Sequence, residues 1–370
     1  MYNTGAMQES ISWQQRLPKP EPSLGSRAYQ HELELALAHS DRRRENYNKY
    51  KTSVRCPELN YLPIKLDIEN VSRCNFHCTM CQVSQWANHQ RAADMRFEDF
   101  RNLLDAQYGL VEIKIQGMGE PTLGGDTFYQ MIKYARDQHI WVRVITNASL
   151  LHINNNYQKL IDSGANEIQI SIDGATKKTF ESIRRGSRFE KVCENCKLIN
   201  EYAKANHMTP TKMWTVVQRS NLCDLPGLVE LAYNLGFQHL VFSLELQDWG
   251  QDEWLRINAA LSARQHLTLE MASDLVHKGN TLGIKVAFWT VKTKYKAGKV
   301  GQLCPWPFER AYISSDMYIV PCCMIGNPDV SNLGNAHYFA NAWNGEAYKR
   351  FRNAHLEGNI PRICLGCYEV

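Results

Sequence analysis

Seven of the twelve cysteines in this chain of 370 residues fall into two groups whose spacing suits metal binding. The first group, Cys74, Cys78 and Cys81, lies in the run SRCNFHCTMC. The second group lies at the other end of the chain and consists of Cys304, Cys322, Cys364 and Cys367. Thiolates are soft ligands that favour iron–sulfur clusters or zinc, so each group predicts a metal centre.

The two groups differ in the number of ligands that they offer. On a four-iron cluster, three thiolates leave one iron open to another molecule, whereas four thiolates close the cluster. Zinc in the first group would need a fourth ligand, and the side chain of His77 would point away from a site formed by all three cysteines. We therefore expect one open and one closed cluster. Zinc is the alternative at both places, unligated core cysteines are a further alternative at the first, and Cys323 could replace Cys322 at the second.

Composition and charge exclude several classes of function. A net charge of +4 is too small to indicate binding to nucleic acid or a membrane surface. No apolar run approaches the roughly 20 residues of a membrane span, and the polar N-terminal segment lacks the apolar core of a signal peptide. We therefore expect a cytoplasmic protein with reduced thiols. The remaining pair Cys193 and Cys196 is expected in a helix core, and Cys56 and Cys223 are expected to be structural or incidental.

Strand-like and helix-like segments alternate about six times in the middle of the chain. The expected strands are residues 64–71, 111–116, 141–146, 167–173, 213–218 and 239–245. Strand followed by helix predicts parallel strands with helical crossovers, here a partial (β/α)6 barrel of the α/β class, similar to an incomplete TIM barrel. We expect an N-terminal arm and helix over 1–60, the barrel over 61–255, and a linker helix with a small cluster-binding domain over 256–370.

The residues suited to ligand binding follow the ends of the expected strands. In parallel α/β folds, ligands bind at the carboxyl ends of the strands. The first cysteine group follows the first strand, the turn Gly117–Glu120 follows the second, and Asn147 follows the third. Ser171 and Asp173 end the fourth. Because these segments are placed independently, their agreement predicts one shared site.

The run SRCNFHCTMC resembles the signature of the radical S-adenosylmethionine (radical SAM) superfamily. In that family three cysteines hold a [4Fe–4S] cluster, and the open iron binds S-adenosylmethionine through its amino and carboxylate groups. One electron from the cluster cleaves this cofactor, and the resulting 5′-deoxyadenosyl radical abstracts a hydrogen atom from the substrate. The resemblance spans roughly residues 64–250 and implies the same chemistry for this chain.

The resemblance also implies residues that contact the cofactor. Gly117, Gly119 and Glu120 are similar to the family's glycine-glycine-glutamate segment, whose backbone contacts the methionine amino group, although Met118 separates the two glycines here. Met80 matches the residue that packs near the adenine.

Later positions extend the implied cofactor site. Asn147 matches a polar position near the ribose. Ser171, Asp173 and Arg184 resemble the segment that holds the ribose and the cofactor carboxylate, with Arg185 as an alternative to Arg184. An arginine suits a carboxylate because its planar fork can bind both oxygens.

The C-terminal segment resembles the SPASM and twitch extensions of the same superfamily. The resemblance rests on YIVPCC, on NLGN at 332–335 and on the final run that ends in CLGC. Four ligands imply one auxiliary [4Fe–4S] cluster, as in the shorter twitch form, so the expected cofactors are two [4Fe–4S] clusters and S-adenosylmethionine. A closed cluster would accept an electron from the substrate radical, which makes the expected enzyme an oxidoreductase.

We expect oxidation of a small molecule such as a sugar or cyclitol alcohol. The alternatives are modification of a ribosomal peptide by crosslinking, epimerisation or decarboxylation, and a non-catalytic iron–sulfur or zinc protein, which would not need the residues at the strand ends. The expected partner is an electron donor such as flavodoxin or ferredoxin, with no nucleic acid or membrane. The candidate catalytic residues are Glu245, Asp248, Glu309, Arg310 and Asp316.

Overall fold

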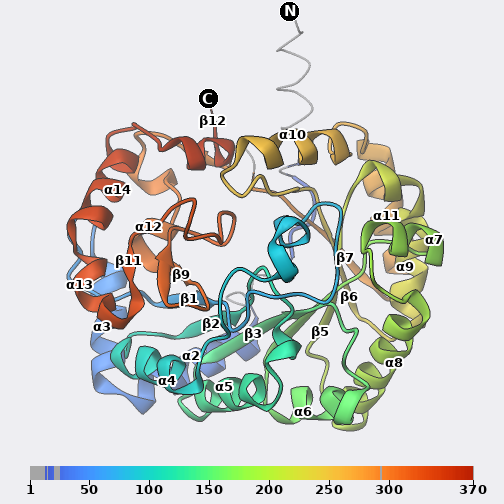
Figure 1. Ribbon diagram of the computed structural model, residues 1–370, viewed down its shortest axis with the longest axis horizontal. Helices are drawn as coiled ribbons and strands as arrows, with labels where there is room; N and C mark the ends of the chain where they lie inside the picture. The colour runs from blue at the N-terminus through green and yellow to red at the C-terminus, as the bar shows by residue number, and fades with distance from the viewer. Residues whose placement is uncertain (1–12, 15, 21–25, 292–293, 370) are drawn as a thin grey trace, which may run out of the picture.

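The structure is a computed structural model that describes residues 13–14, 16–20, 26–291 and 294–369. A curved sheet forms its centre, and helices surround the sheet (Figure 1). The ten strands run in the order β11-β10-β9-β1-β2-β3-β4-β5-β6-β7. Their bounds are β1 (Lys65–Ile68), β2 (Glu112–Ile115), β3 (Trp141–Thr146), β4 (Glu167–Ser171), β5 (Thr211–Val216), β6 (His239–Ser243), β7 (Lys285–Trp289), β9 (Arg310–Ile313), β10 (Tyr318–Val320) and β11 (Gly334–Asn335).

The predicted α/β partial barrel is confirmed, and its sheet is larger than expected. The strands β1 to β6 coincide with the six predicted segments and pair in parallel. Two further strands extend the parallel part: β7 pairs with β6, and β9 pairs with β1. Strands β10 and β11 then add antiparallel pairs beyond β9. The sheet runs across the predicted boundary at residue 256, so the division into domains stays a prediction.

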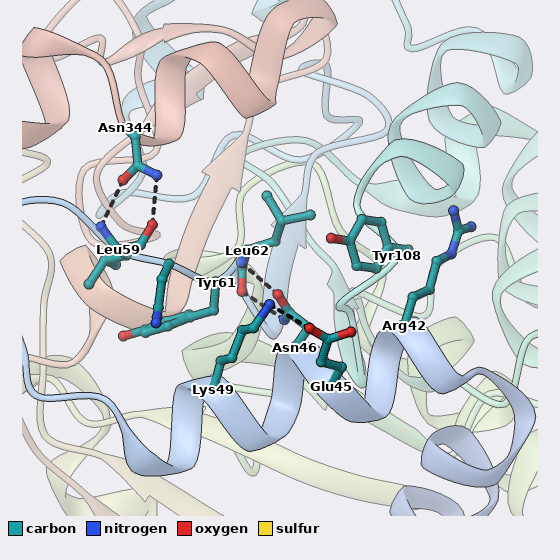
Figure 2. Close-up of a pocket in the computed structure, with 10 residues that line it drawn as sticks. Arg42, Glu45, Asn46, Lys49, Leu59, Tyr61, Leu62, Tyr108 and Asn344 are labelled. Atoms are coloured by element: carbon teal, nitrogen blue, oxygen red, sulfur yellow. Dashed lines mark hydrogen bonds and ion pairs between the residues drawn. The ribbon is translucent and has the colours of Figure 1, made fainter.

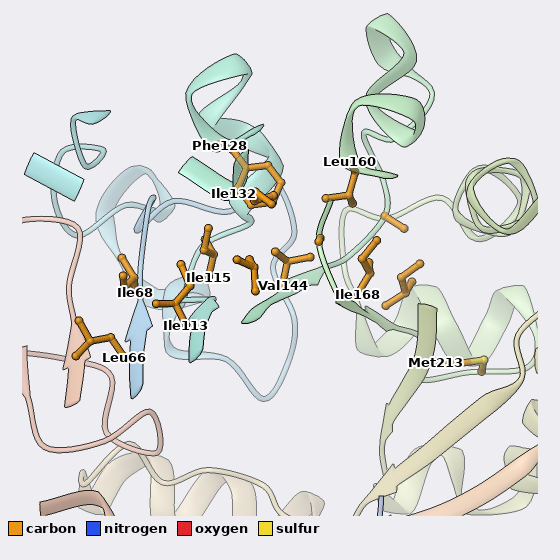
Figure 3. Packing of buried hydrophobic residues seen from close by; sticks show 14 of the residues in the cluster. Leu66, Ile68, Ile113, Ile115, Phe128, Ile132, Val144, Leu160, Ile168 and Met213 are labelled. Atoms are coloured by element: carbon orange, nitrogen blue, oxygen red, sulfur yellow. The ribbon is translucent and has the colours of Figure 1, made fainter. Parts of the chain in front are cut away.

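Amphipathic helices pack on the outer face of the sheet. Their apolar stripes face apolar residues at alternate strand positions, as the two periodicities require. Figure 3 shows Ile115 and Val144 pointing towards Phe128 and Ile132 of α5. The helices of the barrel and of the segment after it are α4 (Phe97–Ala106), α5 (Asp126–Asp137), α6 (Asn156–Asp162), α7 (Lys177–Ile183), α8 (Phe189–Ala205), α9 (Leu225–Asn234), α10 (Asp252–Leu261) and α11 (Leu269–Leu282).

The single N-terminal helix expected before residue 60 is wrong, because two helices form there. These are α2 (Arg27–His39) and α3 (Asp41–Thr52), and the hydroxyl of Ser40 caps α3 by accepting from the Arg43 N–H at 3.4 Å. Arg43 is buried and its guanidinium donates to the carbonyls of Ala36, Tyr108 and Gln138. The Arg43 side chain is therefore packed into the fold.

The predicted loose arm is also partly packed. The Pro18 carbonyl accepts a 2.7 Å hydrogen bond from the Phe288 N–H, so the arm covers the outer edge strand β7. Gln14 is buried and donates to the Arg264 carbonyl at 3.0 Å. Residues 1–12, 15 and 21–25 of the predicted arm lie outside the described residues.

The remaining elements are short. They are β8 (Tyr295–Lys296), β12 (Tyr368–Glu369), α12 (Trp306–Glu309), α13 (Phe339–Trp343), α14 (Glu346–Leu356), and the 3-10 helices η2 (Gln82–Gln85), η3 (Ala87–His89), η4 (Pro121–Gly124), η5 (Ile153–Asn155), η6 (Arg219–Asp224), η7 (Val300–Gln302), η8 (Ala336–Tyr338) and η9 (Arg362–Cys367). Strand β8 pairs with β12 in a separate small sheet. No helix within the described ranges has both the length and the apolar character needed to span a bilayer.

Candidate active site and cluster sites

The first cysteine group lies on the loop that follows β1 and is held by backbone hydrogen bonds. The His77 N–H donates to the Arg185 carbonyl at 2.8 Å, and the Thr79 N–H donates to the Ile183 carbonyl at 3.0 Å. The Cys74 N–H donates to the His89 carbonyl at 3.3 Å. The loop is therefore fixed on both sides, and the His77 ring stacks on the His89 ring at 3.8 Å between centroids.

The three thiols of this group lie near one another in a poorly solvated place. Burial and the neighbouring Cys78 raise the pKa of Cys81 to about 12, and burial followed by Glu120 raises the pKa of Cys74 further. Burial likewise raises the pKa of Cys78. Thiols in this setting stay protonated at neutral pH unless a bound metal supplies positive charge. The donor set therefore fits a metal cluster, and the Phe76 N–H already approaches the Cys74 sulfur at 3.4 Å.

The two glycines after β2 permit a close approach between loops. A Cβ on Gly119 would lie 2.4 Å from the Val71 carbonyl oxygen, on the segment just before Cys74. A Cβ on Gly117 would lie 2.4 Å from the Cγ of Glu69. Only glycine lets this turn press against the cysteine loop, so both positions serve the geometry of the site.

Both carboxylate oxygens of Glu120 accept hydrogen bonds from neighbouring residues of the protein. Its Oε1 accepts from the Thr122 and Thr146 hydroxyls, each at 2.7 Å, and its Oε2 accepts from the Asn147 N–H at 2.6 Å. The side chain is 2% exposed. Its backbone N–H also donates to the Arg73 carbonyl at 2.9 Å, so Glu120 joins the ends of β2 and β3 to the cysteine loop.

Asn147 connects the end of β3 to the cysteine loop. Its Nδ2 donates to the Asn75 Oδ1 at 3.0 Å, and its Oδ1 accepts from the Ser149 hydroxyl at 2.6 Å. Met80 is half-buried against the core, and its carbonyl accepts from the Asn258 Nδ2 at 3.3 Å. Both residues therefore lie beside the first cysteine group, as expected from the sequence.

Asp173 and Arg184 form a buried ion pair beside the same cysteines. The Arg184 Nε lies 2.7 Å from the Asp173 Oδ2, and Asp173 also accepts from the Val216 N–H at 2.7 Å. The Arg184 charge acts on Cys78 and Cys74. No described residue pairs with its terminal nitrogens, which leaves these free for a carboxylate. Arg185 is exposed, so the geometry favours Arg184 for this role.

Ser171 is the last residue of β4 and is half-buried on the inner face of the sheet. No hydrogen bond to another described residue engages its hydroxyl. The hydroxyl therefore remains available to a ligand near the ribose position that the resemblance implies.

The second cysteine group gathers where β12, η9 and the loop after β10 meet. The Cys322 thiol lies near those of Cys364, Cys304 and Cys367, and burial raises its pKa well above the usual value. Burial also raises the pKa of Cys304 to about 11 and that of Cys367 to about 12. Within the described ranges, no three His, Cys, Asp or Glu side chains are arranged around a single metal ion.

Cys323 faces a different environment from its neighbour. Its thiol lies near Asp67, Lys114 and Gln116 on the inner face of the sheet. The geometry therefore favours Cys322 as the fourth ligand and leaves Cys323 as a free thiol. Cys196 is buried in the hydrophobic core of the barrel, and Cys193 packs against that core, as expected for this pair.

The structure argues against four of the five catalytic candidates. Glu245 is 4% exposed, and its Oε1 accepts from the Arg264 guanidinium and the Val291 N–H, each at 2.9 Å. Glu309 accepts from the Tyr50 hydroxyl at 2.7 Å, and it lies with Arg310 at the amino end of β9, opposite the cysteine loop.

The remaining two candidates lie nearer the cysteine groups. Asp316 accepts from the Arg91 guanidinium at 2.8 Å and from the Ser314 hydroxyl at 2.7 Å, so it is also occupied. Asp248 acts electrostatically on Cys367, and one of its oxygens accepts from the Gly250 N–H at 2.9 Å. Of these two residues, Asp248 keeps one carboxylate oxygen without a hydrogen bond from another described residue.

Sequence reasoning missed two buried residues that connect the site. Glu69 at the end of β1 is fully buried and accepts from the Met118 N–H at 3.0 Å and the Ser315 N–H at 3.1 Å. Gln82 follows Cys81 directly, is 1% exposed, and donates to the Met118 sulfur at 2.7 Å. Neither residue belongs to a spacing pattern in the sequence. The only indication of a role is that each is a polar residue close to the cysteine motif.

Gln82 also links the two halves of the molecule. Its Oε1 accepts from the Gln251 Nε2 at 2.9 Å and from the Asn327 Nδ2 at 3.3 Å. Asn327 lies on the loop that begins at Cys322. The loops that carry the two cysteine groups therefore touch at the same opening of the sheet.

A cavity of about 370 Å³ lies elsewhere, between α3 and the segment 59–62 (Figure 2). Its polar groups are already paired: Asn46 bonds to the backbone of Leu62, and Asn344 bonds to the backbone of Leu59. The cavity contains none of the cysteines, so we assign it no part in the chemistry.

Two family models match the chain. Residues 70–231 match the Radical SAM superfamily, and residues 304–368 match SPASM, an iron–sulfur cluster-binding domain. The first range contains the first cysteine group and the strand ends around it. The second range contains all four cysteines of the second group. The resemblance noted from the sequence is therefore confirmed.

Several curated proteins are similar to the chain. A tungsten-containing aldehyde ferredoxin oxidoreductase cofactor-modifying protein of Pyrococcus furiosus is 25% identical over 281 residues, covering 70% of each chain. An AdoMet-dependent heme synthase of Methanosarcina barkeri is 23% identical over 330 residues, covering 81% of this chain and 89% of that protein. The mycofactocin maturase MftC of Mycolicibacterium smegmatis is 26% identical over 193 residues, which cover 52% of this chain and 47% of the maturase.

Solved structures share the fold. SuiB of Streptococcus suis bound to precursor peptide SuiA gives a TM-score of 0.61 at 16% identity, covering 84% of this chain and 70% of SuiB. A structure of anSMEcpe with bound AdoMet gives a TM-score of 0.58 at 18% identity, covering 82% of this chain and 88% of that chain. At these identities the likeness establishes the architecture only.

Proposed function

The chain joins a radical SAM domain to a SPASM iron–sulfur cluster-binding domain, and from this premise we propose that it oxidises a small molecule by radical chemistry. Cys74, Cys78 and Cys81 would hold the open [4Fe–4S] cluster. When bound, the cluster and S-adenosylmethionine supply one electron and a 5′-deoxyadenosyl radical that abstracts hydrogen. The supporting observation is that the segments that follow β2, β3 and β4 converge around these three thiols, of which Cys78 is buried and Cys74 and Cys81 are half-buried.

The chain's own residues would position the cofactor in this proposal. The terminal nitrogens of Arg184 would bind its carboxylate, because the Nε is already fixed by Asp173 at 2.7 Å. The backbone of the Gly117–Glu120 turn would contact its amino group, while the Glu120 side chain holds the turn in place. The Ser171 hydroxyl and Asn147 would lie on the ribose side.

The second group, Cys304, Cys322, Cys364 and Cys367, would hold a closed [4Fe–4S] cluster. Four protein ligands leave no open iron, so electron transfer is the simplest role. The contact between Gln82 and Asn327 brings its loop against the first site. A substrate radical formed there would lose a proton and pass its electron to the second cluster, which makes the reaction a two-electron oxidation. A flavodoxin or ferredoxin would supply the electron that starts each turnover.

A small-molecule alcohol is the proposed substrate, and modification of a peptide is the second candidate. The names of curated relatives refer to a cofactor and to heme, which supports a small molecule. The peptide candidate is favoured by one observation, the shared fold with SuiB, whose structure contains a precursor peptide.

The proposal is tested by reconstituting the protein anaerobically and adding dithionite and S-adenosylmethionine. We expect 5′-deoxyadenosine and about eight irons per chain, as two four-iron clusters require. Cys364→Ala should lose about half of the iron, whereas the control Cys223→Ala at an exposed cysteine should lose none. Absence of 5′-deoxyadenosine from a protein with full iron content, or zinc in place of iron, would contradict the proposal.

A further inference from the structure

The inner face of the sheet carries charged residues, several of which form ion pairs with one another. Glu112 lies 3.0 Å from the Lys65 Nζ and 3.3 Å from the Arg143 guanidinium, and it also accepts from the Tyr29 hydroxyl at 3.1 Å. Although burial raises the pKa of Glu112, Lys65 and Arg143 lower it to about 2. This carboxylate is therefore ionised and fully engaged.

The other two carboxylates of this face are engaged as well. Glu167 lies 3.0 Å from the Arg143 guanidinium and 3.1 Å from the Lys212 Nζ. Asp67 accepts a short hydrogen bond from the Gln116 amide and forms no ion pair with a described residue, and Arg310, Lys114 and Arg143 all act on its carboxylate electrostatically. The cations of this face therefore outnumber its carboxylates.

These ion pairs leave out two cations of the face, Arg310 of β9, whose guanidinium lies over the Trp306 ring, and Lys114. Lys114 occupies the middle of β2, in register with Asp67 on one side and Arg143 on the other. No described side chain or carbonyl forms an ion pair or hydrogen bond with its ammonium, and the residue is only half-buried, so a ligand can reach it. Burial and then the Arg143 charge lower its pKa to about 8, and the opposing effects of Asp67, the Cys323 thiol and Glu167 do not cancel that shift.

The position of Lys114 connects both cluster sites. Three residues separate it along β2 from Met118, which contacts Gln82 beside the first cysteine group. Its charge also acts on the Cys323 thiol, which adjoins the ligand Cys322. The ammonium therefore lies on the face of the sheet towards which both cysteine-bearing loops turn.

An aromatic surface lies farther round the same inner face. Trp214 of β5 and Trp289 of β7 are both half-buried, with ring centroids 5.9 Å apart. Half-buried indole rings offer an apolar wall against which a ring or aliphatic body can pack. The inner face thus combines an excess of positive charge around Lys114 with an apolar wall formed by the two indole rings.

We propose that Lys114 binds a carboxylate of the substrate, whose apolar body packs against Trp214 and Trp289. The inference rests on the proposed function and narrows its substrate class to organic acids. One ammonium balances one carboxylate, whereas a phosphate dianion would leave excess negative charge in a poorly solvated place. The acid is either a free small molecule or a carboxylate carried by a peptide.

Binding of simple probes tests this assignment without radical chemistry. Phenylacetate and its neutral analogue phenylacetamide are titrated into the reconstituted protein while tryptophan fluorescence and calorimetric heat are followed. We expect phenylacetate to bind about ten- to a hundredfold more tightly than phenylacetamide, because the amide loses a charge-assisted contact. Lys114→Met should abolish this preference, Lys114→Arg should retain it, and the exposed control Lys133→Met should leave it unchanged.

Two further probes distinguish the sources of the carboxylate. N-acetylphenylalanine represents a free acid, and an end-blocked hexapeptide with one glutamate beside a phenylalanine represents a peptide. If one of these two probes binds, and its binding depends on Lys114, the result supports the proposal and shows whether the carboxylate comes from a free acid or from a peptide. Equal binding of phenylacetate and phenylacetamide, or full acid binding by Lys114→Met, would overturn it. Formation of 5′-deoxyadenosine by the unmodified protein is measured in parallel and reports on the proposed function separately.

Discussion

Replacing Lys114 with methionine should stabilise the protein. The ammonium is charged at neutral pH in a place that lowers its pKa from 10.5 to about 8. Each unit of this shift corresponds to about 1.4 kcal/mol, so the charged lysine costs the folded state about 3 kcal/mol. Methionine fills a similar volume without a charge, and the melting temperature should therefore rise by about 4 °C.

The pH dependence of this difference provides the sharper test. The pKa of Lys114 is lower in the folded state than in the unfolded state, so the destabilisation is fully present below about pH 8 and is relieved as the pH rises towards 10.5. The melting temperatures of the wild type and Lys114→Met should therefore differ most at pH 7 and converge near pH 10.

Differential scanning calorimetry of the reconstituted proteins between pH 7 and pH 10 measures this difference. Lys133→Met serves as the control, because Lys133 is exposed on α5 and its replacement should change the melting temperature little at any pH. Two results would refute the argument that an unpaired charge is held on the inner face. One is a Lys114→Met protein that is less stable than the wild type, and the other is a gain in stability that is the same at every pH.

Three further predictions concern the cluster sites. Gly119→Ala should lower the iron content by about four per chain and destabilise the fold by about 2 kcal/mol, because the new Cβ would overlap the Val71 carbonyl. Iron analysis and calorimetry measure these two effects, and a normal iron content would contradict the prediction. Cys322→Ser should lose about four irons while Cys323→Ser retains all, and the reverse result would exchange their roles. Burial lowers the pKa of His355 to about 4, so the free energy of unfolding should fall as the pH drops from 6.5 towards 4. His355→Gln should weaken this pH dependence in acid titrations. If the variant shows the same pH dependence as the wild type, His355 is not the residue that causes it.

The positions of the strands and of their ligand-bearing ends could be predicted from the sequence. Segments such as 111–116 and 141–146 combine β-branched residues with a following turn, and parallel strands place those turns on one edge. Met80, Asn147 and Arg184 accordingly lie beside the first cysteines. These features depend on local patterns, which a single sequence carries.

Features that depend on contacts distant in sequence could not be predicted. Strand β9 pairs with β1 although 245 residues separate Lys65 from its partner Arg310, and nothing local marks such a pairing. Adjacent residues in a turn look equivalent in the sequence, so only the fold separates Cys322 from Cys323. The polar residues of β1 and β2 alternate as they would on a solvated face.

The charged residues of that inner face are nevertheless buried. Helices cover one side of the sheet, and the other side is closed over by the cysteine loop and the loop after β10. Lys65 and Glu112 are each less than 5% exposed, yet they form a 3.0 Å ion pair that keeps both polar groups satisfied. The burial of these charges can therefore be recognised only when the positions of both strands and of the loops that cover them are known.

Electron paramagnetic resonance of Cys364→Ala tests the central claim most directly, because this variant should keep only the first cluster. We expect the dithionite-reduced protein to give the signal of one [4Fe–4S]⁺ cluster per chain, and we expect S-adenosylmethionine to change that signal by binding the open iron. A signal indifferent to S-adenosylmethionine, or no iron signal in a folded protein that holds zinc, would contradict a cluster with an open iron at Cys74, Cys78 and Cys81.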